Sequence, residues 1–546
     1  MKKIISRGLV LILILSSFTG CGKSMNDSLS TSDAQYETNS KPYATNVPGA
    51  DYTANANVES PMAMSDVTVE EYMIDGYEED YNTEEYNAIQ ENRYQSVAMN
   101  PLSTFSIDVD TASYSNVRRM LMDNRYVDQG AVRLEEMINY FSYDYATPKN
   151  GEPFSVTTEL SDCPWNKDSK LMLVGLQTEK VDFSDSSASN LVFLIDVSGS
   201  MMDDDKLPLV QKAFGLLTEN LTQKDRVSIV TYASGDAVIL EGANGTQTEK
   251  IMDAINELEA SGSTAGSAGI QTAYAIAERY FIQDGNNRVI LATDGDLNVG
   301  ITSESELTDL ITEKKESGVY LSVLGFGQGN IKDNKMEALA DKGNGNYSYI
   351  DSLLEAKKVL VDEMGATLVT VAEDVKLQLE FNPNVVKGYR LVGYENRMLA
   401  AEDFEDDTKD AGEIGAGHSV TALYEIVLND SKIEIPTSDL KYQVQSELTM
   451  NEDELLTISI RYKRPGEDTS NLMTNVVLAD SWTSRMPKNL NFASAVAEFG
   501  MLLRDSEYKG TSSYDGVLEQ LNNYSYQGDV YREEFVELVK TAKSIQ

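Results

Sequence analysis

The chain has 546 residues, of which 45 are Lys or Arg and 88 are Asp or Glu, giving a formal net charge of −43. This length exceeds that of a single hydrophobic core, so we expect several domains. The excess of negative charge excludes nucleic acid as a partner, because phosphates would be repelled. Two Cys and one His argue against a disulfide framework and against a zinc site.

The first 21 residues are typical of an export signal. Lys2, Lys3 and Arg7 precede an apolar run over 9–15, which is too short to span a bilayer. Phe-Thr-Gly-Cys follows and resembles a bacterial lipobox, which implies a lipoprotein signal peptide over 1–21 and a lipid on Cys21. We therefore expect an extracytoplasmic protein anchored in the cell membrane or outer membrane. The alternative is a freely secreted protein with an incidental cysteine.

Residues 22–83 are predicted to form a disordered acidic linker. This segment is rich in Asn, Ser, Thr and acidic residues and has almost no aliphatic clusters. Such a composition cannot bury enough apolar surface to offset the entropy of ordering.

Residues 84–187 mix both kinds of secondary structure. We predict a half-buried strand over 104–110, a helix around Val117 and Leu121, and a second helix over 132–141. Strand-like runs follow at 154–160 and 171–177. We expect these two runs to form the first part of a β-sandwich that is completed much later in the chain, with Phe154, Val156, Leu171 and Leu173 packed against apolar residues such as Leu377 and Leu379.

Residues 188–368 alternate regularly between strand and helix patterns. This alternation predicts a doubly wound, Rossmann-like α/β domain with a largely parallel sheet. The expected strands are 191–196, 226–233, 237–241, 288–294, 319–326 and 346–350. The expected helices lie near 207–221, 247–260, 267–281, 303–317 and 334–341.

One motif in this domain carries the functional prediction. The buried-type strand Leu191–Ile195 ends in Asp196, and Ser198 and Ser200 follow at alternate positions. A second strand of the same type ends in Asp294, and Thr264 lies on a loop between them. Because parallel strands bring their carboxyl ends to one sheet edge, both carboxylates should meet there. Carboxylates and hydroxyls form an oxygen-only ligand set suited to Mg²⁺ or Mn²⁺.

This Asp-x-Ser-x-Ser, Thr, Asp pattern resembles the von Willebrand factor type A (VWA) domain with its metal-ion-dependent adhesion site. The resemblance implies that all five residues hold the ion, directly or through water. It also implies that an acidic residue of a protein ligand completes the coordination.

Asp203-Asp204-Asp205 follows the motif closely. Integrin A domains place an Asp pair at similar offsets for a second, regulatory Ca²⁺, so Asp203 and Asp204 are candidates for an adjacent ion site. The alternative is that these acids stabilise the N-terminus of the next helix.

After a helix near 352–367, residues 369–465 become strand-rich. Alternating runs at 375–381, 388–394, 418–428, 440–448 and 454–462 predict the second part of the sandwich, with the VWA domain inserted between the two parts. Residues 466–546 are predicted to be helical. The segment around 100–115, together with the region after the A domain, resembles a family of bacterial A-domain lipoproteins from residue 84 onward.

The sequence contains few residues and motifs suited to catalysis. His418 stands alone in a predicted turn, and the sequence contains neither a nucleophile-elbow nor a Walker motif. We therefore expect a binding protein and no enzyme. The favoured role is a lipid-anchored adhesion or receptor-like module, and the alternative is an envelope assembly or scaffold component with a constitutive protein partner.

Overall fold

The computed structural model describes residues 83–180, 187–263, 266–295, 304–436 and 453–545. The predicted signal peptide, Cys21 and nearly all of the predicted linker lie outside these ranges. Within them, no helix is both long and apolar enough to cross a membrane.

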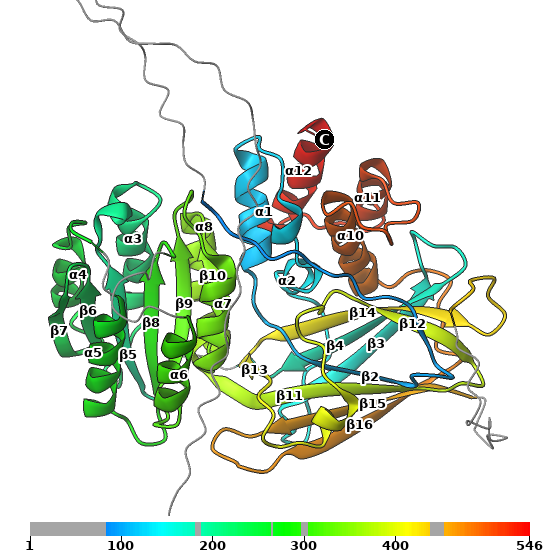
Figure 1. Cartoon of the computed structure of the whole chain (residues 1–546), viewed down its shortest axis with the longest axis horizontal. Helices are drawn as coiled ribbons and strands as arrows, with labels where there is room; N and C mark the ends of the chain where they lie inside the picture. The colour runs from blue at the N-terminus through cyan, green and yellow to red at the C-terminus, as the bar shows by residue number, and fades with distance from the viewer. Residues whose placement is uncertain (1–82, 181–186, 264–265, 296–303, 437–452, 546) are drawn as a thin grey trace, which may run out of the picture. The chain divides into compact units, whose positions relative to one another are not determined.

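The middle of the chain folds into a six-stranded sheet of order β10-β9-β8-β5-β6-β7 (Figure 1). All neighbours are parallel except β7, which runs antiparallel to β6. The strands are β5 (Ser189–Asp196), β6 (Arg226–Tyr232), β7 (Asp236–Asn244), β8 (Asn286–Thr293), β9 (Tyr320–Phe326) and β10 (Tyr347–Ile350).

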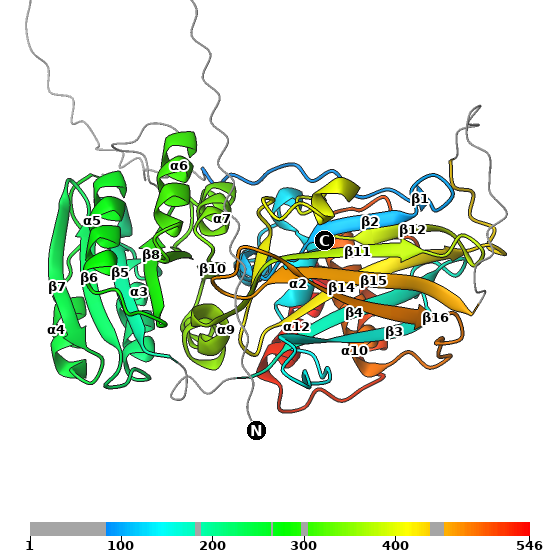
Figure 2. The same ribbon diagram turned by 90° about the horizontal axis from the view of Figure 1, so that it is seen from below.

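Helices cover both faces of this sheet, as the turned view shows (Figure 2). One face packs against α3 (Leu207–Thr218), α4 (Thr248–Asn256), α8 (Leu353–Lys357), the π-helical turn η4 (Lys358–Asp362) and α9 (Met364–Leu368). The other face packs against α5 (Gly266–Arg279), α6 (Glu304–Lys315) and α7 (Asp333–Lys342). Because both faces are covered, the central strands are apolar throughout and not alternating. The predicted doubly wound α/β fold is confirmed.

Two further sheets pack face to face and form the β-sandwich. The first has the order β1-β12-β14-β4-β3, and the second contains β13, β11, β15 and β16 with β2 paired to β11. The strands of the first sheet are β1 (Gln95–Ser96), β3 (Phe154–Asp162), β4 (Lys170–Thr178), β12 (Val386–Val392) and β14 (Ser419–Leu428). Those of the second are β2 (Leu102–Ser106), β11 (Thr370–Phe381), β13 (Gly412–Gly415), β15 (Glu454–Lys463) and β16 (Asn471–Leu478).

The sandwich is split by the α/β domain, as the sequence predicts. β4 precedes the inserted domain and pairs with β14, which follows it, over eight residue pairs from Ser419–Gln177 to Ile426–Lys170. A shared apolar core between the sheets includes Phe154, Leu377 and Leu379. The α/β domain is therefore an insert between two parts of one body.

One detail of the predicted sandwich core is wrong. Leu171 and Leu173 were expected to pack with the second sheet, but they lie on the opposite face of β4, against the helices. Met172, Val174 and Leu176 face the second sheet instead. Both faces of β4 are apolar because each is buried, so its sequence carries no alternation from which the inward face could be read.

A helical layer covers that outer face of the first sheet. It comprises α1 (Ala112–Met122), α2 (Leu134–Asn139), α10 (Lys488–Leu503), α11 (Tyr514–Leu521) and α12 (Val530–Ile545). The short 3-10 segments η1 (Gln129–Ala131), η3 (Gly199–Met202) and η5 (Ala401–Phe404) complete the described helical elements. The predicted C-terminal helices are thus present and share a core with α1 and α2.

The boundaries differ from the prediction at two places, and a third prediction is not tested. The strand expected over 104–110 ends at Ser106. The region from 466 onward is not wholly helical, because β16 forms a hairpin partner of β15 from Asn471. Adjacent strands joined by a short turn pair readily, and the Pro-Gly dipeptide at 465–466 signals this turn. The expected strand over 440–448 lies outside the described residues.

Candidate functional site

The candidate site is built on the carboxyl end of β5, the strand between β6 and β8. Residues Leu191–Ile195 are fully buried, and Asp196 is the last residue of the strand. The sheet order reverses at β5, since the chain continues from it to β6 on one side and reaches β8 on the other. Open α/β sheets bind their ligands at such a switch point.

The two predicted serines lie on the turn that leaves this strand. The backbone N–H of Ser198 donates to Asp196 Oδ1 at 2.9 Å, which closes the turn over the carboxylate. The hydroxyl oxygens of Ser198 and Ser200 lie 3.0 Å apart. Ser198 is buried and Ser200 is exposed, so the hydroxyl pair leads from the carboxylate to solvent.

A second loop is fastened to this turn. Ser261 N–H donates to the Val197 carbonyl at 2.7 Å, and Gly199 N–H donates to the Gly262 carbonyl at 3.0 Å. Thr264, the third predicted hydroxyl ligand, lies outside the described residues. The described part of its loop nevertheless runs beside the Asp-x-Ser-x-Ser turn.

Asp294 is next to Asp196, as the topology predicts. It follows the last residue of β8, Thr293, whose hydroxyl donates to Asp196 Oδ2 at 3.2 Å. Asp196 and Asp294 are both fully buried. Burial raises the pKa of Asp196 to about 6, and the neighbouring Asp294 adds to the rise.

This donor set fits a hard divalent cation. Two buried carboxylates on adjacent strands repel each other and lose their hydration, and a cation between them relieves both costs. All available donors are oxygens, as Mg²⁺ and Mn²⁺ prefer. The side chains that would hold the ion are those of Asp196, Ser198, Ser200 and Asp294, together with Thr264 from the sequence pattern.

Two further residues at this edge were not predicted from the sequence. Lys206 Nζ lies 3.2 Å from Asp294 Oδ2 and 3.5 Å from Asn330 Oδ1. The only signal for Lys206 is its place after the acidic run and before the next helix. Asn330 lies on the loop after β9, and no feature of the sequence points to it.

The candidates for a second ion are exposed. Asp203 and Asp204 lie between the metal motif and α3, and the Asp203 carboxylate is 3.7 Å from Lys206 Nζ. Lys206 occupies the N-cap position of α3, so neither aspartate caps that helix through its side chain. Burial raises the pKa of the next residue, Asp205.

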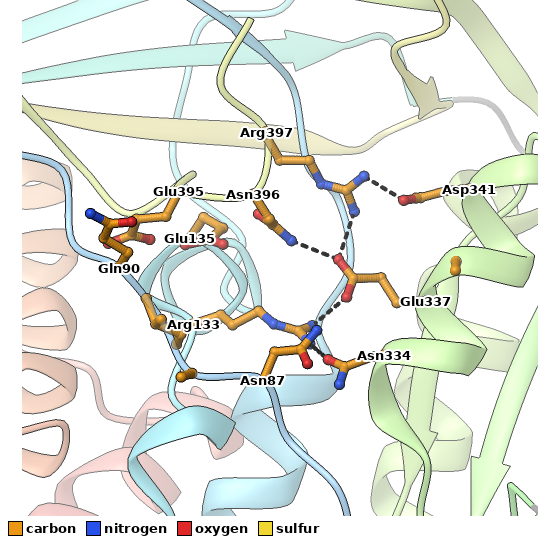
Figure 3. A pocket seen from close by; sticks show the side chains of 13 residues that line it. Asn87, Gln90, Arg133, Glu135, Asn334, Glu337, Asp341, Glu395, Asn396 and Arg397 are labelled. Atoms are coloured by element: carbon orange, nitrogen blue, oxygen red, sulfur yellow. Dashed lines mark hydrogen bonds and ion pairs between the residues drawn. The ribbon is translucent and has the colours of Figure 1, made fainter. Parts of the chain in front are cut away.

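A different carboxylate cluster lies where the α/β domain meets the body; Figure 3 shows one of its members, Glu337, between Arg133 and Arg397. Carboxylate oxygens of Asp108, Glu136 and Glu337 all lie within 4.8 Å of one another, and all three residues are buried. Arg133 and Arg397 insert between them. Arg133 lies 2.5 Å from Glu136 and 3.0 Å from Glu337, and Arg397 lies 3.2 Å from both Asp108 and Glu337.

These two arginines hold helix α7 of the VWA domain against the body. Arg133 also pairs with Asp333 at 2.6 Å, and Arg397 pairs with Asp341 at 2.6 Å. A cavity of about 470 Å³ opens beside them, lined by polar and charged side chains. Because each carboxylate of the triad already contacts a guanidinium, we read this cluster as an ion-paired junction and not as a metal centre.

The remaining reactive groups lie elsewhere in the fold. Cys163 is buried and His418 is half-buried, and desolvation lowers the pKa of His418 and raises that of Cys163. Neither lies on the edge that carries Asp196. Among the described residues, the sheet edge therefore remains the place where predicted functional side chains converge.

The fold and this edge define a protein built around a VWA domain. A profile described as "von Willebrand factor type A domain" matches residues 190–362, and one described as "von Willebrand factor" matches 80–173. A third, described as "Uncharacterized protein YfbK, C-terminal", matches 366–545. VWA domains generally mediate protein–protein interaction or adhesion.

The chain belongs to the YfbK family. It is 42% identical over 468 residues to the Escherichia coli (strain K12) protein described as "Uncharacterized protein YfbK", covering 83% of this chain and 80% of that protein. Among solved structures, a von Willebrand factor type A protein from Catenulispora acidiphila is 15% identical over 72% of this chain and 91% of its own, with a TM-score of 0.40. The ArnB paralog VWA2 from Sulfolobus acidocaldarius is 14% identical over 72% and 98%, with a TM-score of 0.35.

Proposed function

We propose that this protein is a lipid-anchored, extracytoplasmic binding protein that uses a divalent cation at the edge of its VWA sheet to grip an acidic residue of a protein ligand. The observation that supports this most strongly is the pairing of Asp196 and Asp294 on neighbouring strand ends, with Ser198 and Ser200 beside them. A binding site of this kind needs buried carboxylates that hold the ion and an outer side that a ligand can reach from solvent.

Both needs are met by the chain's own residues. Asp196 is held by the Ser198 N–H and the Thr293 hydroxyl, so its carboxylate is fixed before any ion arrives. Ser200 is exposed, which leaves the outer side of the set accessible to a partner. When bound, Mg²⁺ or Mn²⁺ supplies a coordination position that a carboxylate of the ligand completes.

A role in binding and not in catalysis accords with the remaining chemistry. The single histidine, His418, is half-buried and lies in the turn before β14, away from the site, and the buried thiol of Cys163 is held in its neutral form because burial raises its pKa. General acid–base or nucleophilic catalysis needs such groups within reach of a substrate. We therefore propose that the ion serves recognition.

The anchor in this proposal rests on Cys21. Several acyl chains on one residue hold a protein stably on a membrane. In cells labelled with a radioactive fatty acid, the parent protein should carry label and sediment with membranes. Cys21→Ser should lose the label and either accumulate as precursor or become soluble, and persistent labelling of that variant would refute the anchor.

The metal site is tested by thermal unfolding with and without Mg²⁺. We expect millimolar Mg²⁺ to raise the unfolding midpoint of the parent protein, because an ion that binds only the folded state stabilises it. Asp196→Ala should unfold at a similar temperature without Mg²⁺ and show no rise with it. Asp253→Ala, which changes an exposed carboxylate of α4, is the matched control and should respond as the parent does. An equal Mg²⁺ response in Asp196→Ala would exclude this site.

A second experiment separates the two candidate roles. Envelope proteins captured by the soluble part of the chain are compared with Mg²⁺, with chelator, and with the Asp196→Ala variant. Capture that needs both Mg²⁺ and Asp196 supports a reversible, receptor-like module. A partner that remains bound in chelator supports the alternative, a scaffold component of the envelope.

A further inference from the structure

Lys206 places a buried positive charge inside the candidate metal site. Its ammonium donates to the Ser200 carbonyl at 2.9 Å and to Asp294 Oδ2 at 3.2 Å. Only 5% of the residue is exposed. One carboxylate expected to face the metal ion therefore already has a cationic partner that belongs to the protein.

The fold holds the side chain of Lys206 in this position. Its methylene stem crosses directly over Gly327, where an added Cβ would lie 2.4 Å from two of the lysine carbons. Gly327 has φ +73°, a conformation that favours glycine and lets the backbone pass beneath the stem. Lys206 is the N-cap residue of α3, so its backbone is fixed at the start of that helix as well.

Among the described residues, the ammonium has one other carboxylate within ion-pair distance. Asp203 Oδ2 lies 3.7 Å from Nζ, and the Asp203 side chain is largely exposed. A modest rotation of the lysine toward Asp203 would take its charge from the interior of the site to its solvent side. In water this exposed pairing is weak, so it offers a second position without trapping the lysine there.

A divalent ion and this ammonium would share the same carboxylate. Nζ lies 3.2 Å from Asp294 Oδ2, so an ion coordinated by Asp294 would be held by the same carboxylate that the ammonium already contacts. Two cations held so close in a buried site repel each other strongly, because little solvent screens them. Full engagement of Asp294 by the ion therefore requires that the ammonium withdraw.

We propose that the ammonium of Lys206 competes with the divalent cation for Asp294 and thereby weakens metal binding. When the ion enters, the ammonium moves to Asp203. This inference rests on the proposed function, since it assumes that an ion binds at Asp196. Lys206 is thus a positioning residue that sets how much free metal is needed before the site can bind a ligand.

The test is a titration of the full mature chain with Mn²⁺, in which free Mn²⁺ is measured by electron paramagnetic resonance. Lys206→Met keeps the stem and removes the charge, and we expect it to bind Mn²⁺ at least tenfold more tightly than the parent. Asp203→Asn removes the second position of the ammonium, and we expect it to bind about threefold more weakly. Lys212→Met, an exposed lysine on the same helix, is the control and should match the parent.

The outcomes separate this inference from the proposed function. If the parent binds Mn²⁺ and Lys206→Met binds equally or more weakly, the competition is refuted while the metal site stands. If neither protein binds, both proposals fail. If only Lys206→Met binds, the competition is supported and the proposed metal-dependent function is not. Should Lys206→Met fail to fold, Asp203→Asn decides alone, and unchanged or tighter binding in that variant overturns the inference.

Discussion

At the carboxyl edge of the VWA sheet, Asp196 and Asp294 lie among hydroxyls and one ammonium, whereas at the junction Asp108, Glu136 and Glu337 lie among two guanidiniums. Both sets of carboxylates are buried. The first set opens to solvent through the exposed Ser200, and the second is crossed by side chains that link the VWA domain to the body.

The difference teaches what a cluster of acids needs before it can serve as a metal site. The junction triad gathers three carboxylates within 4.8 Å of one another, but its charge is met by planar guanidiniums that form several hydrogen bonds at once. The sheet edge has fewer carboxylates and neutral hydroxyl donors, which leave room for an ion and for its remaining ligands. Whether a cluster of acidic residues can bind a metal ion therefore depends more on which side chains surround the carboxylates than on the spacing of the carboxylates.

The largest effect is expected on removing a junction guanidinium. Arg397 contacts Asp108, Asp110, Glu337 and Asp341, so Arg397→Met leaves buried carboxylates without their partner. We expect a loss of about 3–5 kcal/mol in the free energy of unfolding, as for other broken buried ion pairs. Urea denaturation measures it. Arg464→Met, which changes an exposed arginine, is the control, and a loss below about 1 kcal/mol in Arg397→Met would contradict an ion-paired junction.

A smaller effect is expected from pH at the same junction. Burial, with help from Glu395 and Asp108, raises the pKa of Glu135 from 4.5 to about 8. The folded protein therefore binds more protons than the unfolded chain between these values, so this group makes stability fall as pH rises from 4.5 to 8. Glu135→Gln removes the titration and should stabilise the protein by about 2 kcal/mol at pH 8, less than the full shift implies because neighbouring carboxyls share the protons.

Unfolding midpoints at pH 5, 6.5 and 8 test this expectation. Glu135→Gln should show a shallower decline than the parent, with little difference at pH 5. Glu249→Gln, which changes an exposed carboxylate of α4, should follow the parent at every pH. Equal slopes for Glu135→Gln and the parent would mean that Glu135 is ionised in the folded protein throughout this range.

The smallest effect tests the comparison most directly. Glu337→Gln changes one member of the junction triad, and we expect the Mg²⁺-induced rise in its unfolding midpoint to equal that of the parent within about 1 °C, whatever its baseline stability. Differential scanning fluorimetry is sufficient. A lost response here, with a retained response in Asp196→Ala, would reverse the roles assigned to the two clusters.

Much of the metal edge could be predicted from the sequence. The run Leu191–Ile195 is apolar at every position and ends in an acid, which marks a buried parallel strand with a polar carboxyl end. The topology rule for parallel sheets then places Asp294 beside Asp196, as the structure does. Local pattern and a general rule were enough for these two residues.

The junction and Lys206 could not be predicted in the same way. Arg133, Glu337 and Arg397 are far apart in the sequence, and each resembles an ordinary charged surface residue until the two parts of the molecule are packed together. The position of Lys206 depends on the passage of its stem over Gly327, a tertiary contact without a local signal. The residues of β4 that face the second sheet could not be predicted, because a strand buried on both sides shows no alternation of apolar and polar residues.

The split body also fixes an order of events as the protein is made. β4 ends at Thr178 and β11 begins at Thr370, so the whole VWA domain is synthesised before β11, β13, β15 and β16 of the second sheet and before β12 and β14 of the first. Contacts between residues so distant in sequence form late, because a long loop must close first. While the domain that follows them folds, β3 and β4 therefore lack their neighbouring strand β14, and such an unpaired sheet edge is prone to aggregation. The edge that carries the candidate metal site is complete before the platform that holds it has closed, and folding factors have that interval in which to act.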